Sequence, residues 1–286
     1  MEPEPRISVM VVTYESRPCI GACLDSLRDT AAPWIDGGFV VDNASRDGTA
    51  EWVREHHAWV TVIASDVNLG FGRAMNLAAK RASGEFLLIM NPDVVIHEGA
   101  VAELVRFLHF RPQAAACGPR IVDGEGRFSS DSRRGFPTPM SALGYFSGLD
   151  RLFPRSRSLG GYRLRWLPHD YEVIADALSG CCMMVRRTRF EDAGGFDEDY
   201  FLFGEDIDLC WKLRQNGGEV WYVPSATVTH AKGLSMRRSP HQASREFYRS
   251  MRLFIDKRLT SRYPRLLLSA MKLGMRLRSV CGKRFG

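Results

Sequence analysis

Short, unbroken apolar runs alternate along this chain with longer segments of helical spacing. The clearest run, Phe86–Met90, joins five apolar residues and stops at Asn91-Pro92-Asp93. A short continuous run that ends in turn residues is typical of a strand buried on both faces. The same pattern predicts further strands at residues 7–12, 39–41, 60–64, 181–185, 220–224 and 227–230.

Helical spacing follows the strands of the first half. Pro18 suits a first helical turn, and Leu24 and Leu27 give that helix an apolar face. Further helices are predicted around residues 52–53, up to about residue 82, from about 98 to 110, and from about 205. Strands that alternate with helices predict an α/β fold on a parallel sheet with right-handed crossovers.

Two regions depart from this pattern. Residues 131–172 are rich in Arg, Ser, Gly and Pro, and they fit a partly mobile loop or lid as well as a plain surface insertion. Helices are expected again at about 241–259 and 264–281, the second with two neighbouring stripes. The basic stripe is Arg265, Lys272, Arg276 and Lys283, and the apolar stripe is Leu266, Ala270, Leu273, Leu277 and Val280. This pattern is typical of a helix in a membrane interface, and equally of a helix packed on the body with a solvated basic face.

The composition sets broad limits. The 286 residues are 45% hydrophobic and 25% charged, which suits one large domain or a domain with an appendage. Seven cysteines without a C-x-x-C pair favour reduced thiols in a cytosolic protein over disulfides or a zinc site. The acidic start has no apolar signal-peptide region, and no apolar run approaches the roughly 20 residues that span a bilayer.

The net charge of +6 is unevenly distributed. Residues 232–286 contain 15 Lys or Arg against two acidic residues, a net of +13, and the remaining 231 residues carry −7. Such a basic tail suits an anionic membrane surface or a nucleic acid. We expect no nucleic-acid partner, because the tail lacks regularly spaced aromatics for base stacking and the acidic body would repel a phosphate backbone.

Polar residues collect where the predicted strands of the first half end. They are Thr13, Tyr14 and Glu15, then Asp42 and Asn43, then Asn68, and finally Asn91 and Asp93. Ligands of open α/β sheets bind beyond the carboxyl ends of the strands, so this edge is a candidate nucleotide site. The alternative is that loops are polar in any case.

The glycine pattern argues against a phosphate cradle. Gly70-Phe71-Gly72 lacks the third glycine of the dinucleotide fingerprint, and no P-loop sequence occurs. We therefore expect Arg73 and a metal to handle the phosphates. Asp93 is the candidate metal ligand on a diphosphate, although Asn91-Pro92-Asp93 is also an ordinary turn sequence.

Two later segments contribute candidate chemistry. Glu205 and Asp206 begin a predicted helix directly after the apolar Phe201–Phe203, a setting that general bases use, although acidic residues also decorate helix starts. His230 closes the last strand-like run and is a candidate second metal ligand.

Taken together, these motifs resemble the inverting glycosyltransferases of family 2, which have the GT-A fold. The matching stretches are VVTYES, VVDNASRDGT, NLGFGRAMN, MNPDVV and GGFDEDYFLFGEDIDLCWKLR, in this order between about Ile7 and His230. The resemblance implies a Rossmann-like, mixed and mostly parallel sheet flanked by helices. It places a catalytic domain at 1–231, with a nucleotide part at about 1–120 and an acceptor part at about 121–231. A basic helical extension follows at 232–286.

The resemblance also implies roles for individual residues. Thr13, Tyr14, Glu15 and Asp42 match positions that hold the base and ribose, and Asn68, Arg73 and Asn91 are expected on the nucleotide-sugar side. Asn91-Pro92-Asp93 matches the family's Asp-x-Asp metal motif, with Asn91 as a departure that leaves Asp93 and His230 as the metal ligands. Asp206 matches the catalytic base, and Gly180 and Glu205 are expected on the acceptor side.

Within the family the sequence is most similar to the rhamnosyltransferase and galactofuranosyltransferase branch. This implies a Mg²⁺- or Mn²⁺-dependent transfer, with L-rhamnose from dTDP-rhamnose as the expected donor and a glycan or polyprenyl-diphosphate-linked acceptor. It also implies a cytoplasmic protein held at the inner face of the plasma membrane. Hydrolysis is not expected, because the adjacent Glu205 and Asp206 cannot flank a glycosidic bond. The alternative is a non-catalytic GT-A domain that binds nucleotide sugars or acts as a scaffold in a membrane complex.

Overall fold

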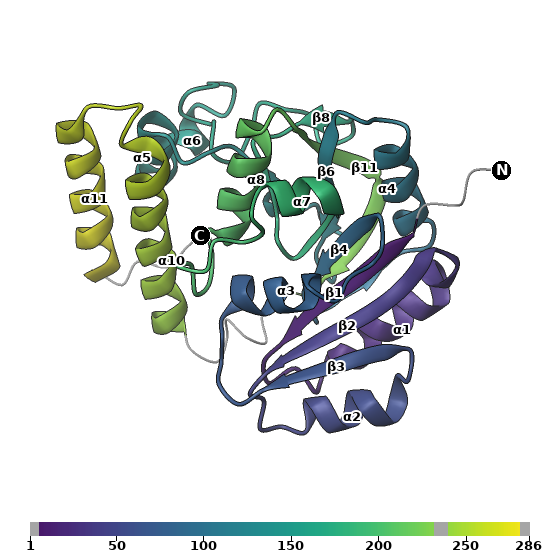
Figure 1. Cartoon of the computed structure of the whole chain (residues 1–286). Helices are drawn as coiled ribbons and strands as arrows, with labels where there is room; N and C mark the ends of the chain where they lie inside the picture. Colours follow the sequence, from purple (N-terminus) through teal and green to yellow (C-terminus); the bar gives the residue numbers. More distant parts are fainter. Residues whose placement is uncertain (1–5, 232–239, 281–286) are drawn as a thin grey trace.

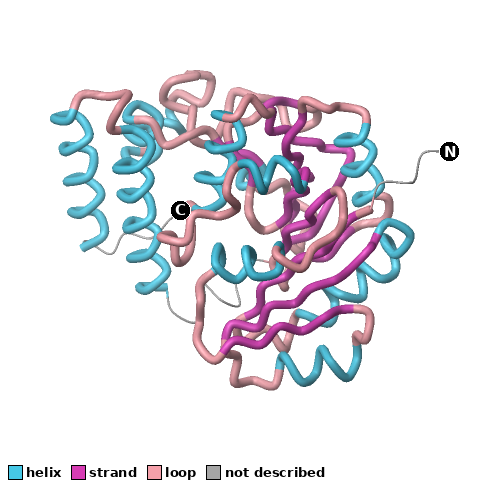
Figure 2. Tube along the Cα trace, in the orientation of Figure 1, coloured by secondary structure: helices cyan, strands magenta, loops and turns pink. Residues whose placement is uncertain are grey.

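A single large sheet runs through the middle of the protein, as seen in a computed structural model that describes residues 6–231 and 240–280 (Figure 2). Within these residues the sheet has nine strands in the order β3-β2-β1-β4-β10-β6-β11-β5, with β8 paired to β11. The strands are β1 (Ile7–Thr13), β2 (Ile35–Asn43), β3 (Val60–Ser65), β4 (Phe86–Met90), β5 (Val94–Ile96), β6 (Ala114–Val122), β8 (Val173–Ile174), β10 (Cys182–Arg186) and β11 (Glu219–His230). A second, two-stranded sheet pairs β7 (Arg133–Arg134) with β9 (Ala177–Leu178).

Six of the nine strands point the same way. β1 pairs in parallel with β2 and β4, β2 with β3, and β6 with β11, whereas β10 runs antiparallel between β4 and β6. The expected mixed, mostly parallel sheet is therefore confirmed. The carboxyl ends of β1, β2, β3 and β4 lie at one edge of the sheet, where ligands of such folds bind.

Helices cover both faces of the sheet (Figure 1). Their bounds are α1 (Ile20–Ala31), α2 (Thr49–His56), α3 (Phe71–Ala79), α4 (Ala100–His109), α5 (Pro139–Ser147), α6 (Leu149–Leu152), α7 (Arg187–Asp192), α8 (Glu205–Gln215), α10 (Pro240–Phe254) and α11 (Arg265–Val280). On β4, Leu88 packs with α1 and α4, whereas Leu87 and Ile89 pack with α3 and α8. Both faces of this strand are buried, as its continuous apolar run predicts.

Two strand predictions were wrong. Residues 220–224 and 227–230 belong to the single strand β11, whose register with β6 shifts between Val223 and Thr227. Pro224 has no N–H to donate, so the ladder is interrupted there without the strand ending. Strand β6 was not predicted, because Ala114–Ala116 give little hydrophobic signal although they are fully buried.

Residues 131–172, where the sequence left a mobile loop or lid and a surface insertion open, contain α5, α6 and β7. The side chain of Thr138 accepts a hydrogen bond from the backbone N–H of Ser141 and caps α5, whose first turn contains Pro139. The ring of Phe146 on α5 stacks on Tyr248 of α10, with 5.9 Å between centroids. This region is therefore part of the packed body.

The C-terminal helices are also attached to the body. α10 runs on through a π-helical turn at Ile255–Leu259, and α11 lies beside it (Figure 1). Inward-facing residues of α11, Leu268 and Met275, join the core, whereas Leu266, Leu273 and Leu277 of the predicted apolar stripe are exposed. In the described part of the chain, every helix is too short or too polar to cross a bilayer. Lys283 of the predicted basic stripe lies outside the described residues.

Candidate active site

The ends of β1 and β2 form the first part of the site. Thr13 and Asp42 are register partners, and the Thr13 hydroxyl donates to Asp42 Oδ1 at 2.9 Å. The backbone N–H of Ser45 donates to the other carboxylate oxygen of Asp42 at 3.0 Å. Because Thr13 and Asp42 are buried, the Asp42 carboxylate is held in one orientation at this edge.

The loops that follow these strands are strained and tied together. Glu15 (φ +54°) and Ala44 (φ +62°) both adopt the left-handed conformation, which non-glycine residues rarely occupy. The Glu15 N–H donates to Ser45 Oγ at 2.8 Å, and its carboxylate accepts from the Arg46 N–H at 2.7 Å. Beside them the Tyr14 ring is 47% exposed, so its face is available to stack on a planar ligand.

The loop after β3 is docked on a distant segment. The side chain of Asn68 accepts from the Gly70 N–H at 2.9 Å, and the Phe71 N–H donates to the Phe201 carbonyl at 3.0 Å. Gly70 has φ +79°, and a Cβ there would lie 2.3 Å from the Phe201 oxygen, so this approach requires glycine. Arg73 is half-exposed and donates through Nε to the backbone carbonyl of Glu198 at 3.2 Å. Asn68 thus shapes the turn, and the guanidinium of Arg73 contacts Glu198.

The two predicted metal ligands lie in contact. β11 pairs antiparallel with β5, which sets His230 opposite Val94. His230 Nε2 lies 3.1 Å from Asp93 Oδ1, and both side chains are about 15% exposed (15% and 14%). Burial disfavours a charged imidazole, but the hydrogen bond to Asp93 and the neighbouring Cys181 outweigh it and raise the pKa of His230 to about 10. Asn91 is fixed through its backbone N–H, which donates to the Cys181 carbonyl at 2.8 Å.

Asp206 lies in the first turn of α8, where the helix dipole favours a carboxylate. Its Oδ2 accepts from the Gly180 N–H at 3.0 Å, and its Oδ1 accepts from the Ile207 N–H at 2.8 Å. A Cβ on Gly180 would lie 3.1 Å from the Asp206 Cβ, so glycine permits the close approach. Gly180 directly precedes Cys181, whose carbonyl accepts from the Asn91 N–H. These contacts connect Asp206 to the segment that carries Asp93 and His230.

Glu205 and Asp208, the carboxylates on either side, differ from Asp206 in their surroundings. Glu205 is buried, and its Oε2 has no hydrogen-bond partner within the described residues. Burial, and then the negative charge of Asp206, raise the pKa of Glu205, which therefore tends to remain neutral. Asp208 is fully buried but paired with Arg258, whose Nε and Nη2 lie 2.7 and 3.0 Å from its two oxygens.

Sequence reasoning missed Arg134. Its Nη2 donates to Asp206 Oδ2 at 2.7 Å, and Tyr162 lies close enough to interact with its guanidinium. Burial opposes the charge, but Asp206 holds the pKa of Arg134 well above its usual range. Both residues belong to the 131–172 region, where no spacing or motif distinguishes one arginine from the next.

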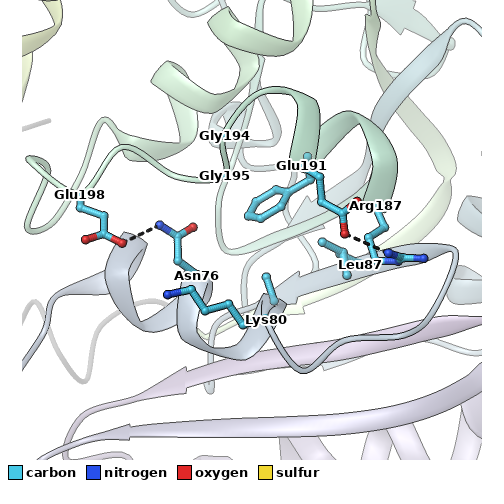
Figure 3. A pocket seen from close by; sticks show the side chains of 10 residues that line it. Asn76, Lys80, Leu87, Arg187, Glu191, Gly194, Gly195 and Glu198 are labelled. Carbon is cyan, nitrogen blue, oxygen red and sulfur yellow. Dashed lines mark hydrogen bonds and ion pairs between the residues drawn. The ribbon is translucent and has the colours of Figure 1, made fainter.

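A cavity of about 400 Å³ lies elsewhere, between α3, β4 and α7 (Figure 3). Its rim carries two polar pairs, Asn76 with Glu198 at 3.1 Å and Arg187 with Glu191 at 2.9 Å (Figure 3). Within the described chain, its lining includes none of the predicted site residues. The candidate site is therefore the strand-end edge and not this cavity.

A nucleotide-type sheet edge next to a buried carboxylate is suited to group transfer from a nucleotide diphosphate. Comparisons with known proteins agree with this class. The family "Glycosyl transferase family 2" matches residues 8–192, and "N-terminal domain of galactosyltransferase" matches residues 167–242. The chain belongs to glycosyltransferase family 2 and is a glycosyltransferase of the hexosyltransferase type.

Individual proteins to which the chain is similar are also glycosyltransferases. The N-acetylglucosaminyl-diphospho-decaprenol L-rhamnosyltransferase of Mycobacterium tuberculosis is 31% identical over 88% of this chain and 84% of its own length. Rhamnosyltransferase WbbL of Escherichia coli K12 is 24% identical over 62% of this chain and 66% of its own length. In fold, the chain is similar to the Pyrobaculum calidifontis mannosyltransferase PcManGT, solved with GDP-Man and Mn²⁺. The TM-score is 0.63 at 18% identity, over 98% of this chain and 72% of that one.

Proposed function

We propose that this protein transfers L-rhamnose from dTDP-rhamnose, with inversion, to a glycan or a polyprenyl-diphosphate-linked acceptor in cell-wall or surface-polysaccharide assembly. The observation that carries the proposal is the junction at the end of β4, where the Asp93–His230 pair is joined through Asn91, Cys181 and Gly180 to the buried Asp206. The sugar and the acceptor class are supported by the 31% identity to the mycobacterial rhamnosyltransferase.

The residues at the strand-end edge and Asp206 have separate roles. Asp42, fixed by Thr13, accepts hydrogen bonds from the nucleoside, and Tyr14 stacks on its base while Glu15 braces the loop. Asp206 accepts the proton of the acceptor hydroxyl while the acceptor oxygen attacks the anomeric carbon and the bond to the diphosphate oxygen breaks. A positioned general base contributes about 10²–10⁴-fold to such a step.

The donor set at Asp93 and His230 fits a divalent cation such as Mg²⁺ or Mn²⁺, which would bind His230 as the neutral imidazole and displace the proton that the raised pKa of His230 retains. One carboxylate and one imidazole are in contact, and Mn²⁺ and Mg²⁺ commonly complete their shells with phosphate oxygens and water. In the described residues, no cluster brings three or more acidic, histidine or cysteine side chains together as ligands. The donor diphosphate must therefore supply part of the shell. When bound, the cation would neutralise the leaving diphosphate as a Lewis acid.

The test is a transfer assay with the full chain, dTDP-rhamnose and a synthetic polyprenyl-diphosphate-N-acetylglucosamine, in Mg²⁺, Mn²⁺ or EDTA. We expect product with inverted configuration, lost in EDTA and lost in Asp206→Asn, whose donor binding stays near wild type. Asp93→Asn should weaken metal-dependent donor binding. Turnover that survives in Asp206→Asn contradicts the base assignment, and donor binding without turnover in the wild type favours a non-catalytic domain.

An anionic membrane surface is the proposed partner of the C-terminal helices, at the cytoplasmic face of the plasma membrane. Leu266, Leu273 and Leu277 on α11 are 84%, 56% and 61% exposed, while other residues of the same helix pack on the body. Exposed leucines beside basic residues suit insertion at a lipid interface, because apolar burial and attraction to anionic lipids add.

Vesicle flotation tests this partner. Serine at Leu266, Leu273 and Leu277 should reduce binding to vesicles with anionic lipid, whereas serine at Leu152, which is 74% exposed on α6, is the matched control. Both proteins should bind weakly to neutral vesicles. Equal binding of the triple variant and the control to anionic vesicles would rule out α11 as the contact.

A further inference from the structure

The environment of Asp206 contains one feature that the proposed function does not use. Arg134 is the one cation that the described residues place in hydrogen-bonding contact with this carboxylate, at 2.7 Å. The side chains are 16% and 8% exposed, so the pair is largely shielded from water. A charge-assisted bond in such a setting is strong and directional.

The two-stranded sheet sets the position of Arg134. Arg134 is paired with Ala177 in the β7–β9 register, and the chain continues from β9 to Gly180. Arg134 and Gly180 both donate to the same oxygen, Oδ2 of Asp206. The small sheet and the segment that follows β9 therefore supply two donors to one oxygen of the carboxylate.

The other oxygen is less occupied. Among the hydrogen bonds of the described residues, Oδ1 of Asp206 accepts from the backbone N–H of Ile207 alone. A carboxylate oxygen has two lone pairs, so Oδ1 keeps one for a further donor. A hydroxyl that loses its proton to Asp206 would find its acceptor at Oδ1, because Oδ2 is already held by two donors.

We propose that Arg134 is a positioning residue for sugar transfer, which places its positive charge on Oδ2 of Asp206 and leaves Oδ1 directed to the acceptor hydroxyl. The proposal rests on the transferase function proposed above. In the step, the acceptor O–H bond breaks, its proton goes to Oδ1, and the new bond to the anomeric carbon forms as the nucleoside diphosphate leaves.

The other ionisable groups around the Arg134–Asp206 pair include carboxyls, a phenol and a thiol. Three further carboxyls lie near the pair: Glu205, which tends to remain neutral, Asp208, which is paired with Arg258, and Asp131. Burial raises the pKa of Tyr162 to about 12, and burial likewise raises the pKa of Cys210 to about 12, so both groups are neutral and offer no compensating charge. Without Arg134, the largely buried Asp206 would lose its one hydrogen-bonded cation within the described residues.

The experiment is the pH dependence of kcat/KM for Arg134→Met and Arg134→Lys, with dTDP-rhamnose and the synthetic lipid acceptor. Loss of a cation beside a carboxylate moves its titration by about 1–3 units, so the acidic limb of the Met variant should move that far to higher pH. Its kcat should fall at least about tenfold at neutral pH, because the carboxylate of Asp206 is no longer held in one orientation towards the acceptor hydroxyl. The Lys variant should return the limb towards the wild-type position while kcat stays low, because an ammonium restores charge but not the planar fork.

Arg214→Met is the matched control. Arg214 makes a 2.7 Å ion pair with Asp176, in the segment that leads to Gly180, but has no hydrogen bond to Asp206 in the described chain. It should lose stability without a shift of the acidic limb. If Arg134→Met shows no melting transition, Arg134→Gln takes its place with the same expected shift.

An unshifted acidic limb in a folded Arg134→Met or Arg134→Gln variant overturns the inference, as does an equal shift in Arg214→Met. A wild-type chain that transfers no sugar is a different result. It contradicts the proposed function, and the position of Arg134 would then have to be explained by stability alone.

Discussion

Replacing Arg258 with methionine should destabilise the fold by about 3 kcal/mol, because Asp208 is then left buried without its ion-pair partner. Asp208 is 0% exposed, and Arg258 contacts both of its oxygens at 2.7 and 3.0 Å. After the substitution, the hydroxyl of Tyr200 at 3.2 Å is the remaining side-chain donor to this carboxylate within the described residues.

The magnitude follows from the burial of the pair. Breaking a buried ion pair by removing one partner costs about 3–5 kcal/mol. Arg258 is 24% exposed, which lets water approach Asp208 once the guanidinium is gone and places the loss at the lower end of that range. For a chain of 286 residues, with an unfolding entropy of about 2.1 cal/mol/K per residue, about 3 kcal/mol corresponds to a fall in melting temperature of about 5 °C.

Urea denaturation of the full chain measures this loss, with Arg249→Met as the control. Arg249 pairs with Glu246 at 3.3 Å on the surface of α10, where the exposed pair contributes at most about 1 kcal/mol. Adding Asp208→Asn to Arg258→Met should recover stability, because the amide removes the unpaired charge. If Arg258 costs no more than Arg249, or the double variant is less stable than the single one, the reasoning is refuted.

Two further predictions concern Glu205 and Gly70. Burial and the charge of Asp206 raise the pKa of Glu205 from 4.5 to about 8. Between these values the unfolded chain releases the Glu205 proton while the folded chain keeps it, so the free energy of unfolding of the wild type falls as pH rises. Glu205→Gln has no proton to release and keeps its stability over the same range. Melting temperatures should therefore favour Glu205→Gln increasingly from pH 4.5 to 8, and a constant difference would contradict the assignment. Gly70→Ala should cost more than the about 1–3 kcal/mol of a left-handed alanine, because its Cβ meets the Phe201 oxygen at 2.3 Å. Gly99→Ala has a similar φ of +75° in open space, and urea denaturation that gives equal losses for both variants would show that the contact costs nothing.

The fold was predictable where the local pattern carries the constraint. Phe86–Met90 is apolar on both faces because both faces of β4 are covered, so its sequence and its burial agree. Alanine-rich β6 could not be recognised, because small side chains are buried here by their neighbours and not by their own hydrophobicity. Pro224 was taken as the end of a strand, although a register shift lets β11 continue past it.

The site was predictable only in part for a related reason. Thr13 and Asp42 follow adjacent parallel strands, so the alternation of strands and helices already brings them to one edge. Contact between Asp93 and His230 depends on the pairing of β5 with β11, which no local signal encodes. Arg134 reaches Asp206 through the small β7–β9 sheet, whose two-residue strands are too short to leave a pattern in the sequence.

The pairing of β11 with β5 also has a meaning for the order of folding during synthesis. Asp93 and His230 are 137 residues apart, so their contact requires a long loop to close. A growing chain can contain β1 to β4, and with them Thr13 and Asp42, long before β11 has been translated. Contacts between such distant residues form late, because closing the long loop lowers the chain entropy before the contact can stabilise the fold. The proposed cation site is therefore among the last features to be assembled, after the strand ends that carry Thr13 and Asp42.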